Sequence, residues 1–214
     1  MEKDAMKIYV LRHGETAMNA KGVLQGWVDE PLNQNGRELA EMTGRGMQGI
    51  HFDFCISSPL KRALETARIV LSESGNDIPI ATDERLKEIR FGDLDGEKIA
   101  DLGEFGRQFF ADPFHFPGGP NGETIPELCE RTQSFLKELI AKDDGKTYLI
   151  STHGCALRAM LNYLYDDPSD YWRGHAPYNC SVNIIEVENG QPKIVAIDKV
   201  YYDPSLIIDH YSDR

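Results

Sequence analysis

Short apolar runs recur along the chain and alternate with longer amphipathic stretches. The runs predict strands over residues 7–12, 52–57, 78–82, 147–152, 181–188 and 193–201. The first, second and fourth are apolar on both faces, which is typical of central parallel strands covered by helices on each side. Between the last two strands, the sequence Glu188-Asn189-Gly190-Gln191-Pro192 contains an Asn-Gly pair. We therefore expect these two strands to form an antiparallel hairpin.

The amphipathic stretches predict helices over residues 34–48, 60–73, 123–142 and 154–165. In the second of these, Ser58-Pro59 is a plausible start signal, since proline favours the first turn of a helix. The alternation of strands and helices predicts an α/β fold with a mainly parallel central sheet, helices on both faces and a C-terminal antiparallel hairpin.

Residues 92–122 interrupt this alternation. The segment is rich in phenylalanine and then reads Pro117-Gly118-Gly119-Pro120-Asn121-Gly122. We predict a partly helical insertion that caps a single domain spanning residues 1–214. The aromatic side chains either form a satellite core or cover the site as a lid, and clustered phenylalanines favour the satellite core.

Composition and charge narrow the class of protein. The 214 residues are 41% hydrophobic and carry a net charge of −12, which suits a globular protein with one core. The negative charge argues against nucleic acid or an anionic membrane as a partner. It still permits a small-molecule phosphoester, because local arginines can outweigh a diffuse field. No apolar run approaches the roughly 20 residues of a membrane span, and the charged start of the chain predicts no signal peptide.

The four cysteines, Cys55, Cys129, Cys155 and Cys180, show no C-x-x-C spacing. We expect reduced thiols and a cytoplasmic location. Cys155 lies close to His153 in the sequence, so it is either a reactive thiol or a small packing residue, and packing is the favoured interpretation.

Two histidines follow strands directly. Arg12-His13-Gly14 ends the first predicted strand, and Thr152-His153-Gly154 ends the fourth. Ligands bind at this edge of open α/β sheets. A lone histidine after a strand is more often structural, but Arg12 places a cation beside His13, and Gly14 lets the backbone turn. A neutral His13 could attack phosphorus while a protonated His153 binds phosphate oxygens.

A third basic group, Arg62, also follows a strand and falls in the first turn of a predicted helix, where anions are favoured. A solvated arginine on a helix face is the alternative. Asn19 lies within reach if the segment after His13 curls around a ligand. A metal site is the rival use of the two histidines, but H-x-H and H-E-x-x-H are absent and the arginines would repel a cation.

The segment from Asp83 to Gly92 contains several carboxylates. Glu88 is flanked by Leu86 and Ile89, so it could point into a partly dry pocket, where burial would favour the protonated form that a general acid needs. These residues alone leave the choice among Glu84, Glu88 and Asp93 open.

The ordered set of motifs resembles the histidine phosphatase superfamily, also called the phosphoglycerate mutase-like family. The similarity covers residues 7 to about 190. Its motifs in this sequence are Leu11-Arg12-His13-Gly14-Glu15-Thr16, Asn19, Gln25-Gly26, Ser57-Ser58-Pro59-Leu60-Lys61-Arg62-Ala63, Glu65-Thr66-Ala67, Leu86-Lys87-Glu88-Ile89, Phe91-Gly92, Asp95-Gly96, Gly122-Glu123-Thr124 and Thr152-His153-Gly154.

The resemblance implies a role for each matching residue. His13 would be the nucleophile that becomes phosphorylated, and Glu88 would protonate the leaving oxygen and later deprotonate water. The implied substrate-binding residues are Arg12, Asn19, Gln25, Gly26, Arg62, His153 and Gly154. The resemblance implies neither a metal nor an organic cofactor.

Family members divide into phosphatases and mutases. Mutases carry paired arginines in the insertion, whereas residues 97–122 here contain Arg107 alone. We therefore expect a metal-independent phosphomonoester hydrolase, with phosphoglycerate mutase-type transfer as the alternative. A non-catalytic module that binds a phosphorylated ligand is the second alternative. The exposed C-terminal hairpin could pair with a second copy of the chain, so a homodimer is a further expectation.

Overall fold

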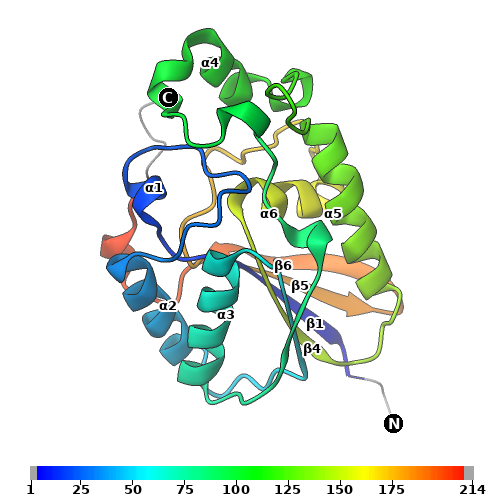
Figure 1. Cartoon of the computed structure of the whole chain (residues 1–214). Coiled ribbons are helices and arrows are strands. Elements are labelled where there is room, and N and C mark those ends of the chain that lie inside the picture. Colours follow the sequence, from blue (N-terminus) through cyan, green and yellow to red (C-terminus); the bar gives the residue numbers. More distant parts are fainter. Residues whose placement is uncertain (1–3, 210–214) are drawn as a thin grey trace.

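The computed structural model describes residues 4–209 and contains one six-stranded sheet with the order β3-β2-β4-β1-β5-β6 (Figure 1). Strands β1 to β4 are parallel to one another, whereas β5 runs antiparallel to β1 and β6 antiparallel to β5. This arrangement confirms the predicted α/β fold with a C-terminal antiparallel hairpin. The strands are β1 (Met6–Arg12), β2 (Phe54–Ser57), β3 (Ile80–Thr82), β4 (Thr147–Thr152), β5 (Val182–Glu188) and β6 (Gln191–Lys199).

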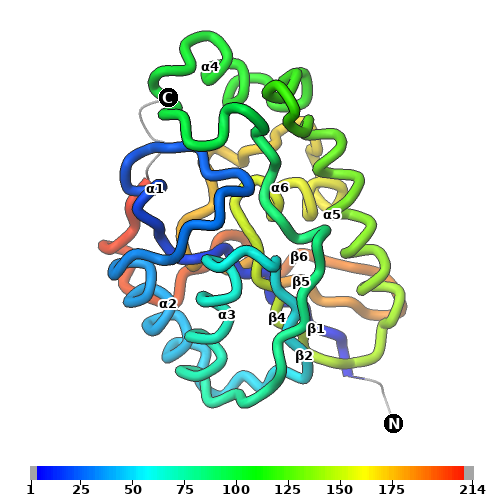
Figure 2. Tube along the Cα trace, in the orientation of Figure 1, coloured from blue at the N-terminus to red at the C-terminus, as the bar shows by residue number. Residues whose placement is uncertain are grey.

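Helices cover both faces of the sheet (Figures 1 and 2). Helices α2 (Gln34–Gly46) and α3 (Lys61–Ser74) pack on one face, and α5 (Ile125–Ile140) and α6 (Gly154–Leu161) on the other. Strand β1 shows why both faces are apolar: Ile8 and Val10 pack with α5 and α6, whereas Tyr9 and Leu11 pack with α2. Burial on both faces is the signature of a central parallel strand.

Element boundaries differ from the prediction in places. Helix α3 begins at Lys61, one residue after the predicted start at residue 60. The Ser58 hydroxyl accepts from the Leu60 N–H at 3.3 Å and also contacts His153. Strand β6 begins two residues early at Gln191. Asn189 and Gly190 both have positive φ, at 52° and 74°, so they form a two-residue turn that starts the pairing at once.

Residues 92–122 contain the helix α4 (Gly103–Ala111) and several single 3₁₀ turns. In Figure 1 this segment lies beyond the sheet, above α6. Phe109 and Phe116 are buried here in an apolar cluster with Ile125 and Leu128 of α5. The cluster is separate from the two that cover the sheet, so these side chains form the satellite core. The short helix α1 (Ala17–Ala20) was not predicted.

No helix among residues 4–209 is long and apolar enough to cross a membrane. None of the four cysteines, all within the described residues, forms a disulfide bond.

Candidate active site

The order of the strands gathers the predicted residues at one edge of the sheet. His13 follows β1 and His153 follows its parallel neighbour β4. Arg62 lies just beyond β2, the next strand, and Glu88 lies beyond β3. The two imidazole rings come to 5.1 Å between their centroids. Segments far apart in the sequence therefore meet because parallel strands end on the same side.

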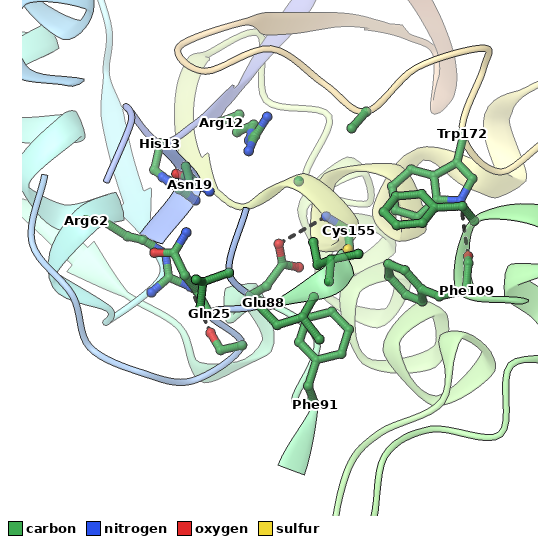
Figure 3. A pocket seen from close by; sticks show the side chains of 17 residues that line it. Arg12, His13, Asn19, Gln25, Arg62, Glu88, Phe91, Phe109, Cys155 and Trp172 are labelled. Carbon is green, nitrogen blue, oxygen red and sulfur yellow. Dashed lines mark hydrogen bonds between the residues drawn. The ribbon is translucent and has the colours of Figure 1, made fainter. Parts of the chain in front are cut away.

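His13, Arg62 and Glu88 line a cavity of about 530 Å³, part of it open to solvent. Figure 3 shows the polar side chains at one end, the aromatic side chains of Phe109 and Trp172 at the other, and Glu88 between them. The lining residues are Arg12, His13, Asn19, Val23, Leu24, Gln25, Gly26, Arg62, Glu88, Phe91, Ile99, Phe109, Phe110, Gly154, Cys155, Trp172 and Ala176. All the predicted site residues line this cavity, His153 excepted.

His13 is buried and its tautomer is fixed. Its Nδ1 lies 2.6 Å from the Gly14 carbonyl oxygen, which can only accept, so Nδ1 carries the proton and Nε2 keeps its lone pair. Burial, followed by the charges of Arg62 and Arg12, holds the pKa of His13 well below its usual value. The ring is therefore neutral at neutral pH, as a nucleophile requires.

Gly14 is required by close packing. A Cβ atom on Gly14 would come within 2.5 Å of the Gly36 carbonyl oxygen in α2, a distance that no real Cβ contact reaches. The Gly14 N–H also donates to the Thr66 hydroxyl of α3 at 3.0 Å. Helices α2 and α3 thus both clamp the turn that presents His13.

Arg62 is fully buried at the start of α3, and backbone acceptors hold its guanidinium. Nη1 donates to the Val28 carbonyl and Nη2 to the Gly26 carbonyl, each at 2.8 Å, while Nε donates to His153 Nδ1 at 3.2 Å. Burial lowers the pKa of Arg62 to about 10, so it still carries its charge at neutral pH. The cation is in place before any ligand arrives.

Arg12 has one buried N–H donor that lacks a hydrogen-bond partner among the described residues. This donor is Nε, whereas Nη1 donates to the Pro177 carbonyl. A buried donor without a partner costs about 1–3 kcal/mol. Gly154 keeps this space open, because even a Cβ there would lie 3.5 Å from Arg12 Nε. An anion in the cavity would supply the missing acceptor.

His153 differs from the expectation of a protonated side chain. Its Nδ1 accepts from Arg62, so only Nε2 carries a proton, which it donates to Ser58 Oγ at 2.7 Å. Burial and the charge of Arg62 hold the pKa of His153 well below its usual value. His153 accepts a hydrogen bond from Arg62 and does not itself line the cavity, so in this structure it orients that arginine. Its direct contact with a phosphoryl group stays a prediction.

Of the three candidate carboxylates, Glu88 is the one that lines the cavity. Its Oε1 accepts from the backbone N–H groups of Ile89 and Ala156, each at 2.9 Å, and its Oε2 from Cys155 N–H at 3.1 Å. Two of these donors belong to the first turn of α6. Glu84 is exposed and pairs with Lys87.

Asp93, the third candidate, accepts from Asn121 at 3.1 Å and does not line the cavity.

Thr16 is a site residue that sequence reasoning missed. Its N–H donates to Asn19 Oδ1 at 3.2 Å, and its hydroxyl donates to Gln25 Oε1 at 2.8 Å. Both amide oxygens are thus tied to Thr16, which leaves the amide N–H₂ groups of Asn19 and Gln25 for the cavity. The signal was present in the sequence, since threonine followed three residues later by a polar residue is a capping pattern.

Arg131 of α5 was also missed, and nothing in the sequence pattern pointed to it. Its guanidinium donates to the carbonyl oxygens of Arg85, Lys87 and Glu88, each at 2.8 Å, and pairs with Glu123. It therefore fixes the backbone that carries the Glu88 side chain.

A reactive thiol or a group of metal ligands would each give the site a different chemistry. Burial and the nearby Glu88 charge raise the pKa of the Cys155 thiol well above its usual value, which supports the packing interpretation. Within the described part of the chain, no three His, Cys, Asp or Glu side chains are grouped to hold a metal ion. Amide and guanidinium donors suit an anion.

Comparison with known proteins gives the family. A family model described as histidine phosphatase superfamily (branch 1) matches residues 8–199. The chain is 35% identical over 162 residues to the 2,3-bisphosphoglycerate-dependent phosphoglycerate mutase of Cytophaga hutchinsonii, covering 73% of this chain and 76% of the relative.

Two solved structures agree with this fold. Bacillus stearothermophilus YhfR has a TM-score of 0.84 and 33% identity, over 92% of this chain and 98% of that chain. A putative alpha-ribazole-5'-P phosphatase from Escherichia coli K-12 has a TM-score of 0.79 and 25% identity, over 92% of this chain and 97% of that chain. The chain therefore belongs to the histidine phosphatase superfamily.

Proposed function

We propose that this protein is a phosphomonoester hydrolase that acts on a small phosphorylated metabolite through a phosphohistidine intermediate. The observation that carries the proposal is the shared cavity, where a neutral imidazole, two guanidiniums and a buried carboxylate meet. A transferring phosphoryl group spreads negative charge over its equatorial oxygens, and positioned cations stabilise that charge.

In the first step, the Nε2 lone pair of His13 attacks phosphorus and the bond between phosphorus and the leaving oxygen breaks. Protonated Glu88 gives its proton to that oxygen. Arg12, Arg62, Asn19 and Gln25 all line the cavity with His13, and Arg12 Nε–H has no partner among the described residues. In this mechanism their free N–H groups bind the phosphoryl oxygens.

In the second step, water takes the place of the alcohol. Glu88, now ionised, removes a proton from this water as its oxygen attacks phosphorus, and the nitrogen–phosphorus bond breaks. Inorganic phosphate leaves, and His13 is neutral again. Splitting the reaction in this way replaces one difficult step by two easier ones.

Mutase activity is the second candidate, favoured by the name of the Cytophaga hutchinsonii relative. A mutase returns the phosphoryl group to a bound acid and needs a cation for the carboxylate of that acid. Among the described lining residues, the arginines are Arg12 and Arg62, both at the phosphoryl end. Arg107 is 71% exposed, pairs with Glu104 and lies outside the cavity lining. The cavity therefore favours hydrolysis.

Phosphate release and 3-phosphoglycerate isomerisation should be measured side by side, with and without a bisphosphate primer. We expect hydrolysis to dominate, an acid-labile phosphoenzyme in rapid-quench samples, and near-complete loss of both in His13→Ala. His51→Ala, which removes an exposed histidine, is the matched control. Isomerisation faster than hydrolysis would identify a mutase. Tight binding of phosphoesters without turnover would identify a binding module.

A further inference from the structure

We propose that the preferred substrate is the phosphate monoester of an apolar, preferably aromatic, alcohol that carries no second anionic group. Phe110 and Trp172 are the specificity-determining residues in this proposal. The inference rests on the proposed function, since it describes the leaving-group half of the same cavity.

The outer half of the cavity is apolar. Aromatic side chains make up half of the residues in its wall and come from the segment after Glu88, from α4 and from the loop that follows α6 (Figure 3). These residues are Val23, Leu24, Phe91, Ile99, Phe109, Phe110, Trp172 and Ala176. An apolar alcohol that enters this space leaves water and gains contact with ring faces and edges.

The outer half of the cavity also lacks a positively charged side chain that could pair with an anionic group of the substrate. The charged side chains in the lining, as far as the structure describes it, are Arg12, Arg62 and Glu88, all close to His13. A carboxylate or second phosphate on the alcohol would have to leave water and lie against aromatic rings. Burying an unpaired anion is strongly unfavourable. The wall therefore excludes doubly anionic esters as well as favouring apolar ones.

The aromatic wall is held in place across two chain segments. Trp172 Nε1–H donates to the Phe109 carbonyl of α4 at 3.4 Å, and the Trp172 ring contacts Phe109 and Phe110, both at 5.4 Å between centroids. The indole N–H is thus used within the protein, so the wall selects by shape and polarity. Phe109 is buried, whereas Phe110 and Trp172 are partly exposed and can be replaced with less damage to the core.

The first test compares three esters of alkyl alcohols with the full-length protein: benzyl phosphate, n-butyl phosphate and 3-phosphoglycerate. All three place similar demands on Glu88, so the comparison isolates the outer half of the cavity. We expect kcat/KM to fall in that order, with benzyl phosphate at least about tenfold above 3-phosphoglycerate. p-Nitrophenyl phosphate serves as the reference for hydrolysis itself.

Variants then assign the effect to the wall. Phe110→Leu should reduce the preference for benzyl phosphate, and Phe110→Arg should shift the ratio toward 3-phosphoglycerate by about tenfold, because it supplies the missing cation. Phe105→Leu is the matched control: Phe105 also lies partly buried on α4 but does not line this cavity. Inhibition by inorganic phosphate reports on the phosphoryl end and should stay unchanged in Phe105→Leu.

The outcomes separate the two proposals. If p-nitrophenyl phosphate and all three esters release no phosphate, the proposed hydrolase function is wrong. If phosphate is released and 3-phosphoglycerate is used as well as benzyl phosphate, the function stands and the substrate class is overturned. A shift of the same size in Phe105→Leu would show that α4 acts through general packing, and would remove Phe110 as a determinant.

Discussion

Thr16 decides which atoms of two amide side chains face the substrate. A side-chain amide offers an acceptor on one side and donors on the other, and only the donors suit a phosphoryl group. Because Thr16 holds the amide oxygens of Asn19 and Gln25, which both line the cavity, we infer that their N–H₂ groups are the atoms left to meet a substrate. Thr16 is itself fully buried and acts through these neighbours, which makes it a positioning residue.

Thr16→Val should weaken binding of inorganic phosphate by about tenfold or more, since it frees the Gln25 amide to turn and a hydrogen bond to a charged group contributes about 1.5–3 kcal/mol. Thr16→Ser, which keeps the hydroxyl, should restore binding. Isothermal titration with phosphate measures both effects.

Thr124 caps α5 with the same motif but lies away from the cavity lining, so Thr124→Val provides the control. It should lower stability by about 0.5–2 kcal/mol while phosphate affinity is retained. Equal loss of affinity in the two valine variants would mean that capping, not amide orientation, is what matters.

Individual site residues were predictable to different degrees. His13 and Arg12 could be placed from the strand and glycine turn around them. Local sequence could not show that Glu88, and neither Glu84 nor Asp93, lines the cavity, because backbone donors of the distant residues Cys155 and Ala156 hold its carboxylate there. That choice depends on how distant elements pack, and local pattern carries no information about it.

Helix α5 fixes the backbone of the segment that ends at Glu88. It lies along one face of the sheet (Figure 1), and its Arg131 bonds three carbonyl oxygens of the segment that ends at Glu88. The planar guanidinium suits this task because it offers several donors in a fixed fork. In the proposed mechanism the helix would act through geometry, since Arg131 fixes the backbone of Glu88 and does not line the cavity.

Arg131→Met should slow the hydrolysis of alkyl esters far more than that of p-nitrophenyl phosphate. A displaced Glu88 protonates the leaving oxygen poorly, and a good leaving group needs that proton least. We expect the substitution to lower kcat for alkyl esters by a factor about tenfold or more larger than the factor by which it lowers kcat for p-nitrophenyl phosphate. Lys137→Met removes a positive charge from the same helix on its exposed side and should slow neither selectively. A uniform loss in Arg131→Met would indicate a folding defect instead.

The length of a helix or strand determined whether it could be predicted from the sequence. The paired short strands and the long amphipathic helices were recognisable from periodicity. Helix α1 has four residues, too few for any periodic pattern, although it carries Asn19. The segment 92–122 showed its phenylalanines, but whether each faces the satellite core or the cavity depends on the fold of α4. Phe116 does the first, and Phe109 does both.

Two neutral imidazoles buried in one site couple folding to pH. The pKa values of His13 and His153 are held below the value of about 6.5 that histidine has in an unfolded chain. Below that pH, the unfolded chain binds protons that the folded protein excludes. The free energy of unfolding should therefore fall as pH drops below about 6.5, by up to about 1.4 kcal/mol per pH unit for each histidine.

Urea unfolding between about pH 7 and pH 5 measures this dependence. His13→Asn and His153→Asn should each flatten the slope, whereas His51→Asn, at an exposed position, serves as the control. A slope unchanged in both buried variants would assign the acid sensitivity to other groups.

The position of β1 in the sheet has a consequence for synthesis on the ribosome. Strand β1, which precedes His13, is made before the other strands of the sheet, yet its two neighbours, β4 and β5, are made only after β2 and β3. At translation rates of about 5–20 residues per second, the apolar β1 waits on the order of ten seconds or more for its partners. Nascent chains that stall before β4 would therefore hold an unpaired apolar segment, and the residues that line the cavity would not yet be brought together.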